Sequence, residues 1–182
     1  MVDKRERLVS AAARVMHANG YAGTTLALVA KDAKIPLGNV YYYFRTKEDL
    51  THAVVDLRVQ ELRALLASAQ KKSSPLARLR AVIAAFEAAS ETIIATGCRY
   101  GNLLHELEKR EDDLAASATR LLSIQVEWFQ VQFRALGAGA RSADLAVELL
   151  CAVQGACLVG LGLKNSALYK KRLRAISRHL GR

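Results

Sequence analysis

Proline and cysteine are scarce in this sequence. Its 182 residues include two prolines and three cysteines, and no tract rich in serine, glycine or proline interrupts them. With 52% hydrophobic residues, this composition excludes a disordered or linker-dominated chain. Cys98, Cys151 and Cys157 are odd in number and lack a paired spacing, which fits a reducing cytoplasm better than a secreted, disulfide-bonded domain. We therefore expect a globular cytoplasmic protein.

Long runs of β-branched residues are also missing, whereas alanine and leucine are abundant. This composition favours helices, and no segment predicts a strand, so we expect an all-α fold. Charged residues begin at once at the N-terminus, so the short apolar core of a signal peptide is missing. Residues 145–163 approach the length of a membrane span, but Glu148 and Gln154 favour a helix buried in protein and no membrane association.

Acidic residues are absent from the end of the chain. The net charge of +10 divides into +3 over residues 1–50, zero over 51–163 and +7 over 164–182. A basic head and tail indicate an anionic partner at one end or both. The tail fits a solvated helix face as well as it fits contact with nucleic acid or with acidic residues of a partner subunit.

The sequence also lacks the features of an enzyme. Its four histidines lie in separate segments, and it has no glycine-rich phosphate loop, serine nucleophile elbow or metal-ligand cluster. An acidic patch most simply caps and solvates two helix ends. We therefore expect no enzyme, no cofactor and no metal site. The patch consists of Glu106, Glu108, Glu111, Asp112 and Asp113.

The apolar periodicity predicts three helices within the first 50 residues, the first with Leu8, Ala12, Val15 and Met16 on one face. Ile35-Pro36 ends the second helix, because the residue before proline avoids helical angles. The string "TKED" from Thr46 indicates the capping box of a fourth. Two short helices joined by a tight turn make a helix-turn-helix. Longer helices are predicted over residues 47–70, 75–95, 101–109, 112–136, 142–163 and 167–180.

The string "VMHANGYAGTTLALVAKDAKIPLGNVYYYFRTKEDL" resembles the tetracycline-repressor (TetR) family of transcription regulators. Lys34 replaces the family's usual turn glycine, which costs up to about 1 kcal/mol if the site keeps a positive φ. Leu37 replaces a usual lysine, which removes one expected DNA contact. The matching positions are Gly20, Tyr21, Thr24, Thr25, Ala30, Ala33, Gly38, Tyr41, Tyr43, Phe44, Thr46, Lys47, Glu48 and Leu50.

The resemblance implies a helix-turn-helix DNA-binding domain, residues 1–46, and a larger helical effector-binding and dimerisation domain, residues 47–182. It implies a homodimer that binds a palindromic operator in double-stranded DNA and is released by a small apolar or aromatic effector, most simply as a repressor. A constitutive DNA-binding protein without an effector is the competing interpretation.

The third helix carries the predicted DNA contacts. At 100° per residue, Leu37, Val40, Tyr41 and Phe44 share one side, from which Val40 and Phe44 reach the core. Outward-facing rings can touch thymine methyls while their hydroxyls donate to phosphates, and Lys47 at a helix N-terminus suits a phosphate. The candidates are Thr24, Thr25, Leu37, Gly38, Asn39, Tyr41, Tyr42, Tyr43 and Lys47.

Small residues among leucines and valines in residues 142–163 permit close helix–helix approach, so we expect a homodimer through residues 142–180, with intramolecular packing as the alternative. Cys98 precedes a predicted helix beside Arg99, where a thiol can be reactive, so a thiol-based electrophile or redox sensor is an alternative function. Aromatic and apolar residues of the middle helices are effector-pocket candidates, or core. They are Phe86, Ile93, Tyr100, His105, Trp128, Phe129 and Phe133.

Overall fold

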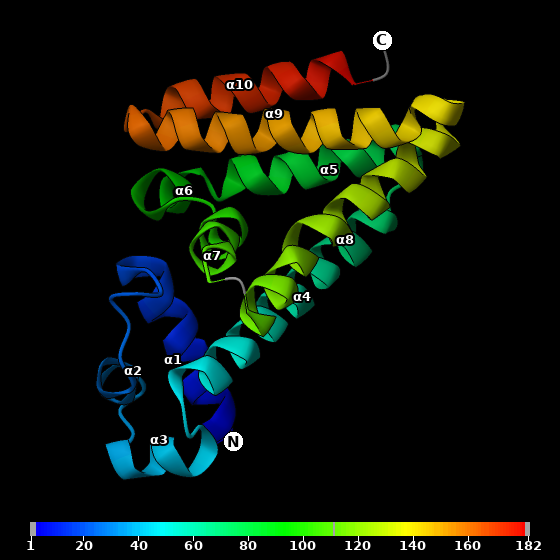
Figure 1. Cartoon of the computed structure of the whole chain (residues 1–182). Coiled ribbons are helices and arrows are strands. Elements are labelled where there is room, and N and C mark those ends of the chain that lie inside the picture. Colours follow the sequence, from blue (N-terminus) through cyan, green and yellow to red (C-terminus); the bar gives the residue numbers. More distant parts are fainter. Residues whose placement is uncertain (1–2, 111, 181–182) are drawn as a thin grey trace. The chain divides into compact units, whose positions relative to one another are not determined.

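The computed structural model describes residues 3–110 and 112–180, and helices account for all their regular structure. No strand occurs in this part of the chain, which confirms the expected all-α fold. Glu111 of the predicted acidic patch lies outside the described residues. The helices are α1 (Lys4–Asn19), α2 (Leu26–Ala33), α3 (Leu37–Tyr43), α4 (Lys47–Gln70), α5 (Pro75–Ala88), α6 (Ser90–Thr96), α7 (Arg99–Glu108), α8 (Asp113–Ala135), η1 (Gly139–Arg141), α9 (Ser142–Gly162) and α10 (Ser166–His179) (Figure 1).

The chain divides into two compact units that share three helices. The first unit combines Met1–Glu61 with Asn102–Leu121, and the second combines Leu62–Gly101 with Leu122–Arg182. Helices α4, α7 and α8 each begin in one unit and end in the other. The predicted boundary between residues 46 and 47 falls inside the first unit, because the first half of α4 packs with the N-terminal helices.

In the first unit α1 packs on α2, and α2 packs on α3. The predicted apolar face of α1 is buried over its full length. The buried side chain of Arg58 links α4 to α1, because its guanidinium donates to the carbonyl of Ala13 in α1 at 3.0 Å. The same guanidinium donates to Glu61 in α4 at 2.8 Å. Because both terminal nitrogens of the buried Arg58 guanidinium donate hydrogen bonds, the cost of an unpaired buried charge is avoided. The three N-terminal helices are therefore held on the first half of α4.

In the second unit α9 and α10 lie side by side, with α5 packed on α10 (Figure 1). The prediction of one helix over residues 75–95 is wrong, because the helix breaks at Ala89 (φ −83°, ψ 9°) into α5 and α6. No proline or glycine lies at this break. The break lets α6 pack on α9 while α5 stays on α10, so packing over long sequence distances accounts for it.

Helix α9 is the most apolar element. The stretch Gly139–Gly162 is long and apolar enough to cross a bilayer, yet only 33% of its most apolar window is buried. Leu158 is 71% exposed, and Val147, Val159 and Leu163 are exposed beside it. We expected a helix buried in protein, but a single chain covers only one side of α9.

Candidate nucleic-acid interface

The turn between α2 and α3 depends on a strained lysine. Lys34 ends α2 in the left-handed conformation (φ 52°, ψ 47°), so the site keeps the positive φ on which its predicted strain depends. The next amide, that of Ile35, donates to the carbonyl of Ala30 at 3.0 Å and closes the helix end. A left-handed non-glycine residue costs about 1 kcal/mol relative to glycine. Directly after Lys34, Ile35 is buried and Pro36 is the N-cap residue of α3, so three residues complete the turn between the two helices.

Helix α3 has one buried side and one open side. Val40 and Phe44 are buried, and the guanidinium of Arg5 lies 5.2 Å from the centroid of the Phe44 ring. Tyr42 is 81% exposed, and its ring meets that of Tyr43 edge to face at 5.1 Å. Phe44 therefore anchors the helix, whereas Tyr42 stays largely exposed and has its ring contact with the neighbouring Tyr43.

Leu37 and Tyr41 share the helical side of Val40, yet they are 39% and 53% exposed. The buried residues Val40 and Phe44 form one edge of this stripe, so Leu37 and Tyr41 on its other edge remain at the surface. Their positions suit the DNA contacts predicted for them better than a core role.

Gly38 and Asn39 lie in the first turn of α3. A Cβ added at Gly38 would meet no atom within 4 Å, so the fold itself does not require glycine there. Asn39 is half-buried, and its backbone N–H donates to the carbonyl of Pro36 at 2.9 Å. Both positions are compatible with close approach of another molecule to this end of the helix.

The two threonines before α2 have different environments. Thr24 is buried, and its hydroxyl donates to the carbonyl of Gly20 at 2.7 Å. Thr25 is exposed, and its oxygen caps α2 by accepting the N–H of Leu28 at 3.2 Å. Of the two predicted contacts, the structure leaves only Thr25 accessible from outside.

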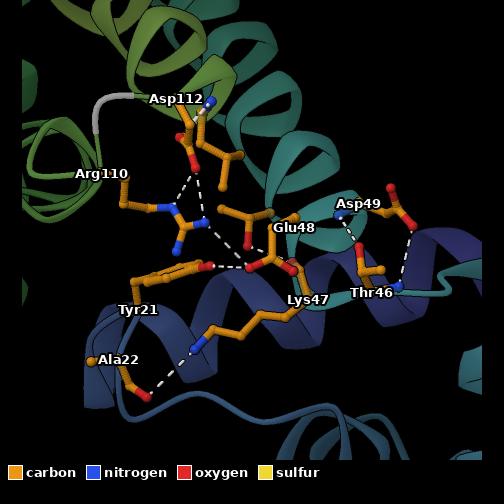
Figure 2. Close-up of polar contacts among 10 residues, drawn as sticks. Tyr21, Ala22, Thr46, Lys47, Glu48, Asp49, Arg110 and Asp112 are labelled. Carbon is orange, nitrogen blue, oxygen red and sulfur yellow. Dashed lines mark hydrogen bonds and ion pairs between the residues drawn. The ribbon is translucent and has the colours of Figure 1, made fainter.

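The predicted capping box at the start of α4 is confirmed. The Thr46 oxygen accepts the N–H of Asp49 at 3.0 Å, and the Asp49 carboxylate accepts the N–H of Thr46 at 3.2 Å (Figure 2). Lys47 does not extend into solvent, however. Its ammonium lies 3.4 Å from the carbonyl of Ala22 and 4.0 Å from the centroid of the Tyr21 ring. This lysine is therefore committed to contacts within the free protein.

Tyr21 is the centre of a polar cluster that sequence patterns do not reveal. Its hydroxyl donates to Glu48 at 2.8 Å, and its backbone N–H donates to the carboxylate of Glu106. Arg110 lies 5.0 Å from the ring centroid, on the face opposite Lys47 (Figure 2). Within the first unit, this cluster joins the turn after α1, the start of α4 and the end of α7.

Arg110 extends the cluster through two ion pairs, with Glu48 at 3.4 Å and with Asp112 at 2.8 Å. Asp112 also accepts the N–H of Leu114 at 3.0 Å at the start of α8. The acidic residues Glu106 and Asp112 therefore bind specific partners rather than only solvating helix ends.

The cluster shifts the pKa values of its members. Burial, with the hydrogen bond to Glu48 as the second cause, raises the pKa of Tyr21 to about 12. The same hydrogen bond is the main reason that the pKa of Glu48 lies below its usual value. Burial lowers the pKa of Lys47. At neutral pH Tyr21 therefore keeps its proton and donates it to the ionised carboxylate of Glu48. The cations Lys47 and Arg110 lie against the ring of the same tyrosine.

Two exposed cations near α3 were missed as DNA-contact candidates. Lys34 lies immediately before the helix and Arg45 immediately after it, and both side chains are exposed. Cations flanking a short exposed helix are well placed for phosphates, which take most protein–DNA hydrogen bonds. Their positions at the two ends of α3 were the sequence signal that could have identified them.

The predicted effector residues are mostly core. Phe86, Ile93, Tyr100, Phe129 and Phe133 are buried in the second unit. Trp128 is half-buried, with its ring 5.9 Å from that of Phe129. His105 is exposed and belongs to the first unit. The structure therefore does not gather all seven residues in one unit.

The second unit also contains an open cavity of about 690 Å³, which most of the effector candidates do not line. Its walls come from the end of α8, from α9 and from α10, and Phe133 is the one effector candidate that lines it. Arg141, Arg172 and Glu148 give it a mixed charge. Among the described residues, no group of three His, Cys, Asp or Glu side chains could hold a metal ion.

This arrangement defines a helix-turn-helix protein, with α2 as the first helix, a tight turn at Lys34 and α3 as the second. Residues 8–54 match the sequence profile described as "Bacterial regulatory proteins, tetR family". Residues 8–54, which include the helix-turn-helix and the start of α4, therefore belong to the tetR family of bacterial regulatory proteins.

The relatives agree with this assignment. The chain is 40% identical over 84 residues to the HTH-type transcriptional regulator BetI of Burkholderia thailandensis, an alignment that covers 45% of the chain and 43% of the relative. It is 28% identical to the HTH-type transcriptional repressor DhaR of Mycobacterium sp. strain GP1, covering 80% of the chain and 74% of the relative. The chain thus spans less than half the length of the first of these two relatives.

The fold extends the likeness along nearly the whole chain. The crystal structure of regulatory protein TetR from Rhodobacter sphaeroides superposes with a TM-score of 0.83 at 26% identity, covering 96% of this chain and 97% of that one. The likeness therefore includes the second unit, which lies outside the family profile.

Proposed function

We propose that this chain is a cytoplasmic DNA-binding transcriptional repressor that reads a palindromic operator as a homodimer and is released by a small effector. The observation that carries the proposal is α3, which buries Val40 and Phe44 but leaves Tyr41 and Tyr42 open. Apolar side chains exposed side by side on one short helix mark an interaction surface. The regulator and repressor names of the two relatives support the same function.

In this proposal α3 enters the major groove of DNA. The rings of Tyr41, Tyr42 and Tyr43 contact thymine methyls and sugars, and their hydroxyls donate to phosphates. Gly38 allows the helix to approach base edges closely. Leu37, Asn39 and Thr25 complete the contact surface, and Lys34 and Arg45 bind the phosphates on either side.

Lys47 has a conditional role in this proposal. Its ammonium already contacts Ala22 and Tyr21, so binding a phosphate requires it to leave the carbonyl and the ring. Lys47 therefore contributes less to DNA affinity than an exposed lysine does.

A second copy of the chain covers the open side of α9. Val147, Leu158 and Leu163 are exposed there, and a Cβ at Gly155 or Gly162 would meet no atom within 4 Å. Small residues among exposed apolar ones permit two helices to approach closely, and a twofold pairing buries the same face of each chain. The dimer proposed through residues 142–180 therefore accounts for both the apolar face and its glycines.

For the effector we propose an apolar or aromatic small molecule held in the second unit, among the buried rings that include Phe86, Phe129 and Phe133. Its binding shifts the population toward conformations whose recognition helices no longer match the operator spacing. The cavity that Phe133 lines, at about 690 Å³, is within the range of small-molecule sites.

Selection from a pool of randomised duplexes tests the DNA-binding proposal without knowledge of the operator. We expect enrichment of an inverted repeat with half-sites about 10 base pairs apart, bound by two chains. A Tyr42→Ala variant should lose at least about fivefold in affinity for each half-site, because base contacts contribute about 1–3 kcal/mol each. Thr119→Ala, an exposed substitution on α8, serves as the control. Enrichment of no sequence, or of a single asymmetric site, would contradict the proposal.

A further inference from the structure

Two cysteines that are 59 residues apart in the sequence meet inside the second unit. Cys98 lies immediately before α7, and Cys157 lies in α9. Both are buried, both carry free thiols, and the two thiols are hydrogen-bonded to each other. The third cysteine, Cys151, is exposed on α9. The fold therefore creates a dithiol pair that the sequence spacing did not indicate.

The surroundings of Cys98 favour its thiolate. Its sulfur accepts hydrogen bonds from the thiol of Cys157 and from the backbone N–H groups of Gly101 and Tyr100, which lower its pKa below that of an ordinary thiol. The side-chain amide of Gln154 donates from α9 at 3.7 Å. A sulfur at a helix N-terminus with several donors is the environment in which thiols become nucleophilic.

Cys157 has the opposite environment. The neighbouring Cys98 sulfur and burial raise its pKa, so it keeps its proton while Cys98 is ionised. Its sulfur lies 3.5 Å from the hydroxyl of Tyr169, which in turn donates to the carbonyl of Phe86 at 3.3 Å. One sulfur of the pair is therefore poised to attack, and the other holds a proton next to it.

We propose that Cys98 and Cys157 are an oxidisable pair that a peroxide converts to an intramolecular disulfide. The Cys98 thiolate attacks one oxygen of hydrogen peroxide, so that an S–O bond forms, the O–O bond breaks and hydroxide leaves. The sulfur of Cys157 then attacks the sulfenic sulfur, forming the S–S bond and expelling water as it loses its proton. In total, two thiols and one peroxide give one disulfide and two waters.

The disulfide ties the beginning of α7 to α9. Helix α7 is continuous from Arg99 to Glu108, and on its last turns Glu106 accepts the backbone N–H of Tyr21. A shift at the beginning of α7 is therefore passed along one helix to the Tyr21 cluster. This step rests on the DNA-binding function proposed above. We expect oxidation to lower DNA affinity by about 5- to 150-fold, the usual range of allosteric coupling.

The test treats the reduced full-length protein with hydrogen peroxide and counts free thiols after unfolding. We expect the count to fall from three to one, with Cys98 and Cys157 joined in the non-reduced peptide map. Cys151→Ser is the matched control, and it should lose both of its remaining thiols. Cys98→Ser and Cys157→Ser should form no intramolecular disulfide, with thermal melts confirming that they fold.

Three outcomes overturn the inference. They are an unchanged thiol count, a disulfide between chains through Cys151, and a wild-type disulfide that leaves DNA affinity unchanged. Because the thiol count and peptide map need no DNA, they remain informative even if neither redox form binds any duplex. If neither redox form binds any duplex, the proposed DNA-binding function is contradicted instead.

Discussion

Replacing Gly38 by alanine should make the protein more stable and its DNA binding weaker. Gly38 lies inside helix α3 with open space around it, so the added methyl group meets no atom of the free protein. Alanine is favoured over glycine in helices by about 0.5–1 kcal/mol. For a chain of this size that gain raises Tm by about 1–4 °C.

The same methyl group would stand between α3 and the bases. Losing one well-formed base contact costs about 1–3 kcal/mol, or about 5- to 150-fold in affinity for each half-site. Thermal melting monitored by circular dichroism measures the first effect, and fluorescence anisotropy with the selected duplex measures the second. Because the two effects have opposite signs, damage to the fold cannot imitate the expected result.

Thr119→Ala provides the comparison, since it also replaces an exposed helical residue by alanine and lies outside the helix-turn-helix. It should raise Tm without changing DNA affinity. If Gly38→Ala raises Tm and leaves affinity unchanged, the glycine does not approach DNA. If Tm falls instead, the space around Gly38 is not open and the structural argument fails.

Three other predictions concern single residues. Lys34→Gly should raise the free energy of unfolding by about 1 kcal/mol in urea denaturation, because glycine adopts the left-handed conformation without strain; no gain would mean that Lys34 makes a compensating contact. The pKa of Tyr21 is about 12 in the folded state and 10.0 in the unfolded state, so its stabilising effect should be lost as the pH rises between these values. In an ultraviolet titration, the Tyr21→Phe variant should lack one tyrosine that ionises late in the wild-type protein. Leu158→Glu should convert a dimer to a monomer in sedimentation, whereas an unchanged mass would place the interface elsewhere.

Local features of the fold could be predicted from the sequence because they depend on neighbouring residues. The box formed by Thr46 and Asp49 closes within four residues, and the positive φ of Lys34 follows from its place in the turn. The helix break at Ala89 could not be predicted, because no residue there disfavours a helix. It comes from packing on α9 and α10, which lie far along the chain.

The same distinction applies to the candidate site. The exposed Tyr42 and the buried Phe44 could be anticipated from their spacing on a short helix. The contacts of Lys47 could not, since they depend on a ring 26 residues away. Arg110 reaches Glu48 from a separation of 62 residues, and no local pattern records that pairing.

The exposed apolar side of α9 has a consequence for synthesis of the protein. The ribosome releases α9 before α10, the helix that packs beside it, so in the unfinished chain the side of α9 that faces α10 is uncovered in addition to its exposed side. Domains fold as units during synthesis, and uncovered apolar surface promotes aggregation. A chain stopped after Lys164 would therefore remain in that state and collect in the insoluble fraction of the cell.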